Sequence, residues 1–284
     1  MYLLGIGVAL VLAGIVFFFA FNWADLHRFA KLGLVGACII ASAGYAAAVG
    51  LGRLSGRTAL TAATVLVGPL WAVFGQTYQT GADPWNLFAA WAALTLPWVV
   101  GARFALLWLV WIAIADTALV LFWEQALHQV NLESWLALWV IHGGAWLASS
   151  WGRDRQIPWL DVPWARRMVA CAALVCLVVP SAKLIFNGPD NWDIIAPMIY
   201  VTTCGWLYHR HTAPTRDLPI LTAAAAGVVV LTSCTLVQLI ADWGEIPVFF
   251  ILTLAIGGQV AGFAKWLRRL HREEQQTPAT GEIS

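Results

Sequence analysis

Ten apolar stretches, each about as long as a membrane-spanning helix, divide this chain and leave only short loops between them. Charged residues make up 11% of the chain and apolar residues 61%, whereas ordinary soluble domains are about 25% charged. A soluble fold would leave much of this apolar surface in water, and a bilayer is the more favourable surrounding for it. The sequence therefore predicts an all-α integral membrane protein, a polytopic bundle of about ten transmembrane helices. The expected spans are 2–21, 32–51, 58–75, 85–101, 104–122, 132–151, 164–182, 193–208, 218–241 and 246–266.

The basic residues predict the orientation of these spans, because cytoplasmic loops carry an excess of Lys and Arg. With the amino terminus placed inside, the outer segments hold only Arg28, Lys31 and Lys183 of the 16 basic residues, and the other 13 lie inside. We therefore expect an inner-membrane protein with both termini in the cytoplasm. The first span has no basic residue before it and no clear cleavage site after it, so it is expected to be a membrane helix rather than a removed signal peptide.

Five spans fall in each half of the chain. The expected organisation is a membrane domain over residues 1–125, a second membrane half over 126–266 and a cytoplasmic tail over 267–284. Two five-span halves have opposite orientations in the membrane, as in inverted-repeat transporters, whose sites lie near the midplane between the halves. A comparison of residues 5–23 with 135–153 gives no convincing similarity, so this symmetry is permitted but not shown.

The most distinctive local sequence is the outer turn over residues 74–85, FGQTYQTGADPW. Asp83-Pro84 is a strong helix start, because an Asp side chain can cap free backbone N–H groups and Pro fits the first helical position. Gly81 supplies the conformationally permissive residue before it. A structural role for this turn is favoured, but a cap explains Asp83 alone, so ligand binding stays open. The candidate outer-face residues are Gln76, Tyr78, Gln79 and Asp83.

This turn, together with Asn22-Trp23 after the first span, resembles the bacterial family of predicted membrane proteins catalogued as domain of unknown function 2157. The resemblance covers roughly residues 1–125 and is densest over 70–103. It implies a bacterial membrane protein and brings no established activity with it. The expectation for the second half of the chain therefore rests on hydropathy alone.

Polar groups inside the predicted spans are the candidate intramembrane site, because a charge there costs several kcal/mol. Asp116 lies about six residues from the outer end of its span, roughly 9 Å deep, and His142 lies about 15 Å deep in the next span. The two helices are consecutive and antiparallel, so we expect these side chains to form a proton-sensitive pair. His142 also shares a helical face with Trp135, Trp139 and Trp146, which could hold a cation or an aromatic ligand. The favoured alternative is a packing stripe in which His142 bonds a neighbouring helix.

Two further buried polar residues, Gln238 and Gln259, are expected to form interhelical hydrogen bonds rather than to bind a ligand. The five cysteines all lie in apolar spans, without metal-ligand spacing, so they are interpreted as packing residues. No nucleophile triad, phosphate loop or zinc motif is present, which makes an enzyme the least favoured class. No cofactor, metal or nucleic acid is expected.

Two functional classes remain after these exclusions. The first is a transporter or channel for a small solute or for protons, favoured slightly by the two five-span halves, by Asp116 and His142, and by the polar outer turn. The second is a non-transporting membrane scaffold, sensor or subunit of a membrane complex, favoured because no continuous row of polar residues crosses the spans. In either class the lipid bilayer is the expected partner.

Overall fold

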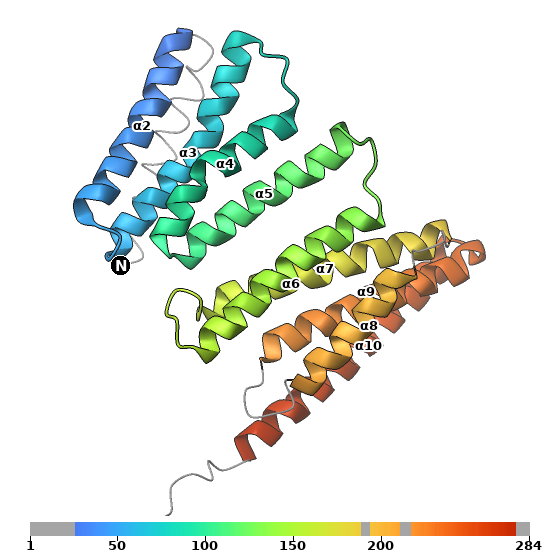
Figure 1. The fold of residues 1–284 in the computed structure, drawn as a ribbon. Helices are drawn as coiled ribbons and strands as arrows, with labels where there is room; N and C mark the ends of the chain where they lie inside the picture. The colour runs from blue at the N-terminus through green and yellow to red at the C-terminus, as the bar shows by residue number, and fades with distance from the viewer. Residues whose placement is uncertain (1–25, 189–193, 211–216, 277–284) are drawn as a thin grey trace, which may run out of the picture. The chain divides into compact units, whose positions relative to one another are not determined.

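The fold was analysed in a computed structural model, which describes residues 26–188, 194–210 and 217–276. Within these ranges the chain forms nine α-helices and one short 3-10 helix (Figure 1). The first predicted span, 2–21, and Asn22-Trp23 after it lie outside the described residues. The α-helices are α2 (Arg28–Val49), α3 (Leu54–Tyr78), α4 (Pro84–Ala102), α5 (Ala105–Gln125), α6 (Leu132–Asp154), α7 (Pro163–Asn187), α8 (Ile195–Arg210), α9 (Leu218–Ile240) and α10 (Glu245–Gln276), and the 3-10 helix is η1 (Ala241–Trp243).

Each predicted span from 32–51 onward coincides with one of these helices, which confirms the all-α membrane class. Seven helices of the described ranges are long and apolar enough to cross a membrane: α2, α3, α4, α5, α7, α9 with η1, and α10. The helix α8 has only 16 residues, and α6 mixes its apolar residues with four tryptophans and His142. The number of ten spans and their orientation therefore stay predictions.

The chain divides into two compact units, Met1–His128 and Gln129–Ser284, which are described separately. In the first unit α2 packs along α3, α4 packs along α5, and α3 also contacts α4 (Figure 1). Apolar side chains from all four helices meet in one core, which consists of Ala46, Leu60, Val99, Ala102 and Leu107. The core lies near the ends of the helices at which α2 turns into α3 and α4 turns into α5.

Arg57 stabilises this end of the first unit. Its Nε donates a hydrogen bond to the carbonyl oxygen of Leu51, at 2.6 Å, and its guanidinium lies 5.9 Å from the centre of the Phe104 ring. The turn itself requires glycine at Gly56, where a Cβ would collide with the carbonyl oxygen of Gly50. From the sequence, Arg57 was counted only among the basic residues that predict the cytoplasmic side. In the structure it also holds the loop between α2 and α3.

Two tryptophans of the first unit lie between helices and form hydrogen bonds from one helix to the next. The indole N–H of Trp91 donates to the carbonyl oxygen of Thr64, at 2.7 Å, and its ring covers Gly68, where a Cβ would collide with it. The indole N–H of Trp111 donates to the carbonyl oxygen of Ala92, at 2.8 Å. Each bond satisfies a polar N–H inside an apolar bundle and holds two neighbouring helices together.

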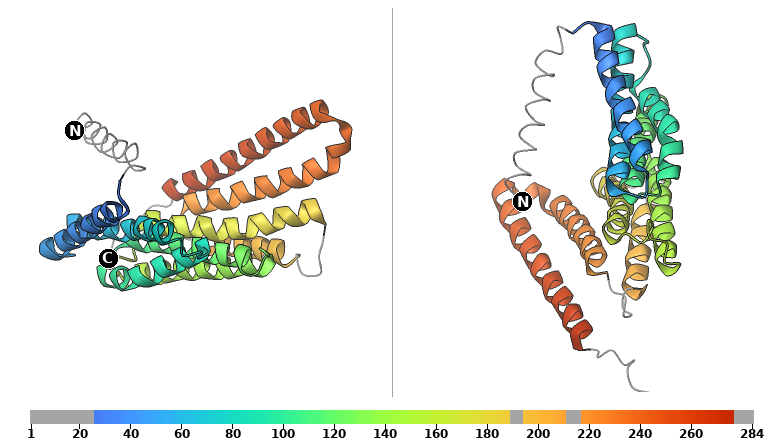
Figure 2. Two further views of the ribbon diagram at one scale, coloured as in Figure 1. Left: turned by 90° about the horizontal axis from the view of Figure 1, so that it is seen from above. Right: turned by 90° about the vertical axis from the view of Figure 1, so that its left-hand side faces the viewer.

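In the second unit α7 is the central helix and packs against α6, α8 and α9, whereas α10 packs along α9. Figure 2 shows α9 and α10 as a long antiparallel pair. Gln259 of α10 accepts a hydrogen bond from the Thr232 hydroxyl of α9, at 2.6 Å, which confirms the interhelical role expected for Gln259. Tyr200 of α8 is buried over Gly227 of α9 and donates to the carbonyl oxygen of Ala224, at 2.6 Å.

Candidate functional site

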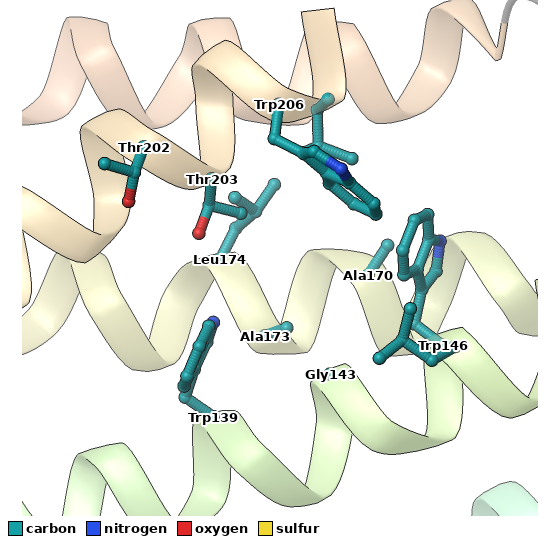
Figure 3. Close-up of a pocket in the computed structure, with 11 residues that line it drawn as sticks. Trp139, Gly143, Trp146, Ala170, Ala173, Leu174, Thr202, Thr203 and Trp206 are labelled. Atoms are coloured by element: carbon teal, nitrogen blue, oxygen red, sulfur yellow. The ribbon is translucent and has the colours of Figure 1, made fainter. Parts of the chain in front are cut away.

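A cavity of about 370 Å³ lies between α6, α7 and α8 in the second unit (Figure 3). It lies along the middle of α6, the first half of α7 and the second half of α8. Aromatic side chains border it, small side chains leave the space, and two threonines add hydroxyl groups. The lining includes Trp139, Gly143 and Trp146 of α6, Ala170 and Ala173 of α7, and Thr202, Thr203 and Trp206 of α8.

The cavity exists because small residues of α6 and α7 lie opposite each other. On α6, Trp139, Gly143 and Trp146 are spaced by four and three residues, so they share one face of the helix. A Cβ built on Gly143 meets no atom within 4 Å, which places open space directly beside it. Across this space α7 presents Ala170 and Ala173, whose side chains are single methyl groups.

Two tryptophans form one wall of the cavity. The rings of Trp146 and Trp206 lie 5.2 Å apart at an interplanar angle of 77°, the edge-to-face geometry that aromatic pairs prefer. Trp146 is buried, while Trp206 is partly exposed at the open side. The pair holds α6 against α8 and gives the cavity a rigid aromatic surface.

The polar groups of the cavity are few and uncharged. The Thr202 hydroxyl is already used, since it donates to the carbonyl oxygen of Met198 at 3.0 Å. Figure 3 shows the Thr203 hydroxyl and the indole nitrogen of Trp139 directed into the space between α6 and α8. Within the described ranges neither group makes a hydrogen bond, and no charged side chain lines the cavity. The site can therefore offer an indole N–H and a hydroxyl to a ligand.

Of the predicted intramembrane residues, Trp139 lies in the cavity wall and His142 does not. His142 is buried, with 6% of its surface exposed, but it is not among the lining residues. At 100° per residue it lies about 60° around α6 from Trp139, on the side away from Gly143. The four residues of the expected face thus lie within about 60° around α6, but the cavity lies on the Gly143 side of that face, and His142 is at the opposite edge.

The remaining aromatic residue of that face, Trp135, lies one turn closer to the start of α6. The Lys183 ammonium of α7 lies 5.9 Å from the centre of the Trp135 ring, within reach of a cation–π contact. This contact is at the predicted outer ends of α6 and α7. It stabilises the helix pair beside the cavity and does not contribute to the lining.

Asp116 belongs to α5 of the first unit, where it is partly buried, whereas His142 belongs to α6 of the second unit. The structure thus places each residue within its expected helix. Their pairing stays a prediction.

The outer turn has the predicted backbone but not the predicted cap. The helix α3 ends at Tyr78, Gln79 takes a left-handed conformation (φ 45°), Gly81 follows with φ 65°, and α4 begins at Pro84. Asp83 occupies the position before the helix, but its side chain makes no capping hydrogen bond, so the expected cap is wrong. The Asp83 side chain is exposed.

Gln125 at the end of α5 supplies the missing acceptor. Its side-chain oxygen accepts a hydrogen bond from the Trp85 backbone N–H, at 3.2 Å, and the Phe122 ring packs edge-to-face on Trp85 with centroids 5.1 Å apart. Sequence reasoning missed Gln125 because it is 40 residues away from the helix start that it caps. Because Asp83 is a favourable local cap residue, there was no reason in the sequence to expect a cap from a distant residue.

The other candidate residues of the outer turn are exposed. The side chains of Gln76, Tyr78 and Gln79 all lie on the surface, and the Tyr78 ring packs on Phe74 with centroids 4.7 Å apart. In the described part of the chain no hydrogen bond joins these three side chains. They share one end of α3, and their role in ligand binding stays a prediction.

An ion cluster around the buried Asp217, where α7 and α9 begin, was not expected from the sequence. Asp217, 5% exposed, binds the Arg167 Nε at 2.9 Å and the Arg166 guanidinium at 3.5 Å, and Arg166 also reaches Asp161 at 3.5 Å. From the sequence, these arginines count only among the basic residues that predict the cytoplasmic side. In the sequence, Asp217 is recognisable only as an acidic residue before an apolar run. No pattern connects it to Arg166 and Arg167, about 50 positions earlier.

The comparisons with known proteins give a match for the first part of the chain only. Residues 1–108 match a family model described as "Predicted membrane protein (DUF2157)". No curated protein and no solved structure matches the chain. The match ends before the cavity, whose residues lie between positions 139 and 207. The resemblance seen in the outer turn is thus confirmed, over residues 1–108 rather than 1–125, and this segment is similar to the predicted membrane proteins of that family.

Proposed function

We propose that this protein binds a small, uncharged and largely apolar solute in the cavity between α6, α7 and α8, and carries it across the membrane. The observation that supports binding is the cavity itself. Its volume of about 370 Å³ falls within the range of about 300–1,000 Å³ that is common for small-molecule sites. An apolar lining with a few directed polar groups is also typical of such sites.

The lining argues for an uncharged solute. A cation over an indole ring gains about 0.5–2 kcal/mol, whereas placing a charge within a bilayer costs about 2.5–3.5 kcal/mol even on insertion scales. No carboxylate among the described lining residues offsets the difference. Of the two ligand classes that the tryptophan face suggests, the aromatic or otherwise apolar one is therefore favoured. A hydrogen-bond acceptor on the solute would match the Trp139 N–H and the Thr203 hydroxyl.

Ligand stabilisation tests the binding step. A panel of neutral aromatic and aliphatic metabolites is screened by thermal unfolding of the detergent-purified chain, because a ligand at 100 times its dissociation constant adds about 2.7 kcal/mol to the folded state. Gly143→Leu fills the cavity, and Gly144→Leu is the matched control, since its neighbourhood is also open but it does not line the cavity. Stabilisation that Gly143→Leu abolishes and Gly144→Leu retains supports the site. Stabilisation that both variants retain rejects it.

The proposed topology is ten spans with both termini in the cytoplasm of a bacterial inner membrane. It is supported by the seven membrane-length helices of the described residues and by the one-sided distribution of Lys and Arg. A reporter that is active only outside the cytoplasm is expected to be active when fused after Gln79 or Glu124. It is expected to be inactive after Arg155 or Arg216, and the reverse pattern would overturn the orientation.

Proton coupling is the most specific part of the transport proposal. It assigns Asp116 and His142 to a proton-sensitive pair, on the basis of their predicted depth in consecutive spans. A double-mutant cycle with Asp116→Asn and His142→Ala measures the coupling directly. Non-additive losses of stability of at least about 0.5 kcal/mol support the pair, and additive losses reject it.

The alternative is a non-transporting scaffold, sensor or subunit of a membrane complex. One observation favours it: the most apolar 18-residue window of α10 has no buried residue within the described part of the chain, so this helix can face another protein as well as lipid. A protein that binds no solute in the screen and copurifies with a defined membrane partner would support this alternative over transport.

A further inference from the structure

The carboxy-terminal end of α10 carries four basic residues on one face of the helix. At 100° per residue, Lys265, Arg268, Arg269 and Arg272 fall within an arc of about 100°. All four are exposed, and together with Ala261, Gly262 and Trp266 they line a broad hollow on the surface of the second unit. No carboxylate is among the described residues that line it.

The opposite face of α10 fixes the direction in which this basic face points. Leu270 is buried, and Phe263 and Leu267 are partly buried. The ring of Trp266 lies 6.3 Å from that of Phe263 and 6.0 Å from that of Tyr208, at the end of α8. Trp and Tyr side chains gather where a membrane meets water, so this group indicates the level of the interface.

Small residues continue the basic face toward the apolar part of α10. Gly258, Ala261 and Gly262 lie within about 60° of the Lys265 direction around the helix. A Cβ on Gly258 or Gly262 would meet no atom within 4 Å, so the surface beside them is open. The basic face therefore continues into an open apolar track, which we define by Gly258, Ala261 and Gly262.

We propose that this surface binds an anionic phospholipid, with the phosphate headgroup at Lys265, Arg268 and Arg272 and an acyl chain along the Gly258–Gly262 track. Clustered Lys and Arg next to a membrane helix attract anionic lipid headgroups, and guanidinium groups bind phosphate oxygens by paired hydrogen bonds. A soluble phosphate would use only the basic residues. The open apolar track beside them is the feature that fits a lipid.

The test is native mass spectrometry of the detergent-purified full chain, titrated with phosphatidylglycerol or phosphatidylcholine. The clustered variant Lys265→Gln/Arg268→Gln/Arg272→Gln is compared with the scattered variant Arg53→Gln/Arg103→Gln/Arg155→Gln, which removes the same charge from three separate exposed sites. Each basic residue near an anionic lipid surface adds about fivefold to binding, so the clustered variant is expected to lose about 100-fold in phosphatidylglycerol affinity. The scattered variant is expected to retain it.

A second variant keeps every charge and blocks the track. Gly258→Leu/Gly262→Leu introduces side chains into open space on a helix, so the fold is retained, and phosphatidylglycerol binding is expected to fall at least about tenfold. Glycerol 3-phosphate serves as the soluble source of the same headgroup. Three results would each overturn the proposal. They are equal losses of phosphatidylglycerol binding in the clustered and scattered variants, phosphatidylcholine binding to the unmodified chain as tightly as phosphatidylglycerol, and glycerol 3-phosphate binding as tightly as phosphatidylglycerol.

Discussion

Asp217 has only 5% of its surface exposed, and its carboxylate contacts Arg166 and Arg167 near the start of α7. A buried ion pair contributes little net stability over an apolar packing, but removal of one partner leaves a charge without compensation. The arrangement therefore makes the junction between α7 and α9 sensitive to a single side chain. The cavity begins one helical turn further along α7, at Ala170.

Asp217→Asn is expected to destabilise the protein by about 3 kcal/mol, because the largely buried Arg166 loses a charged partner. The control is Asp154→Asn, which removes an exposed carboxylate 3.5 Å from Arg153 and is expected to cost less than about 1 kcal/mol. Denaturant unfolding of both variants in detergent measures the difference. Equal stabilities would show that Asp217 is not a structural anchor.

Tyr200 and Gly227 are expected to act as a pair. Tyr200→Phe removes the hydrogen bond to Ala224 and should cost about 1 kcal/mol, while Gly227→Ala places a methyl group against the Tyr200 hydroxyl and should cost about 1–3 kcal/mol. Because the clashing oxygen is absent in the Tyr200→Phe background, Gly227→Ala should cost less there. Strictly additive losses in the double variant would contradict the close contact.

At the scale of elements, the helices were predictable and their contacts were not. Each helix from α2 to α10 follows from a local apolar run, and turn signals such as Gly81 and Pro84 are local as well. The cavity depends instead on Gly143 of α6 lying opposite Ala170 and Ala173 of α7. No local sequence pattern predicts which residues of two helices lie opposite each other. Trp139, which lines the cavity, could be proposed from the sequence because aromatic residues on one helical face are visible there.

The start of α4 provides a direct comparison between the local and the tertiary cap. Gln125→Ala is expected to cost about 1 kcal/mol, because the Trp85 N–H loses its acceptor. Asp83→Ala is expected to change stability by less than about 0.5 kcal/mol, as for an exposed side chain without a bond. Thermal unfolding ranks the two variants. The reverse order would restore Asp83 as the cap that the sequence favours.

At the scale of the whole molecule, the chain has two units with different features. The first unit carries the DUF2157 match, the outer turn, an apolar core and helices joined by indole hydrogen bonds. The second unit carries the aromatic cavity, the buried ion cluster and the basic end of α10. The proposed solute site lies in the second unit, beyond the segment that matches the family.

The most direct test of this account is solute uptake into proteoliposomes that contain the purified protein. The solute is the one that gives the largest stabilisation in the thermal screen, and the proteins compared are the unmodified chain, Gly143→Leu and Gly144→Leu. The account predicts uptake by the unmodified chain and by Gly144→Leu, and none above empty liposomes by Gly143→Leu. Uptake by Gly143→Leu at the rate of the unmodified chain, or no uptake by any of the three, would contradict it.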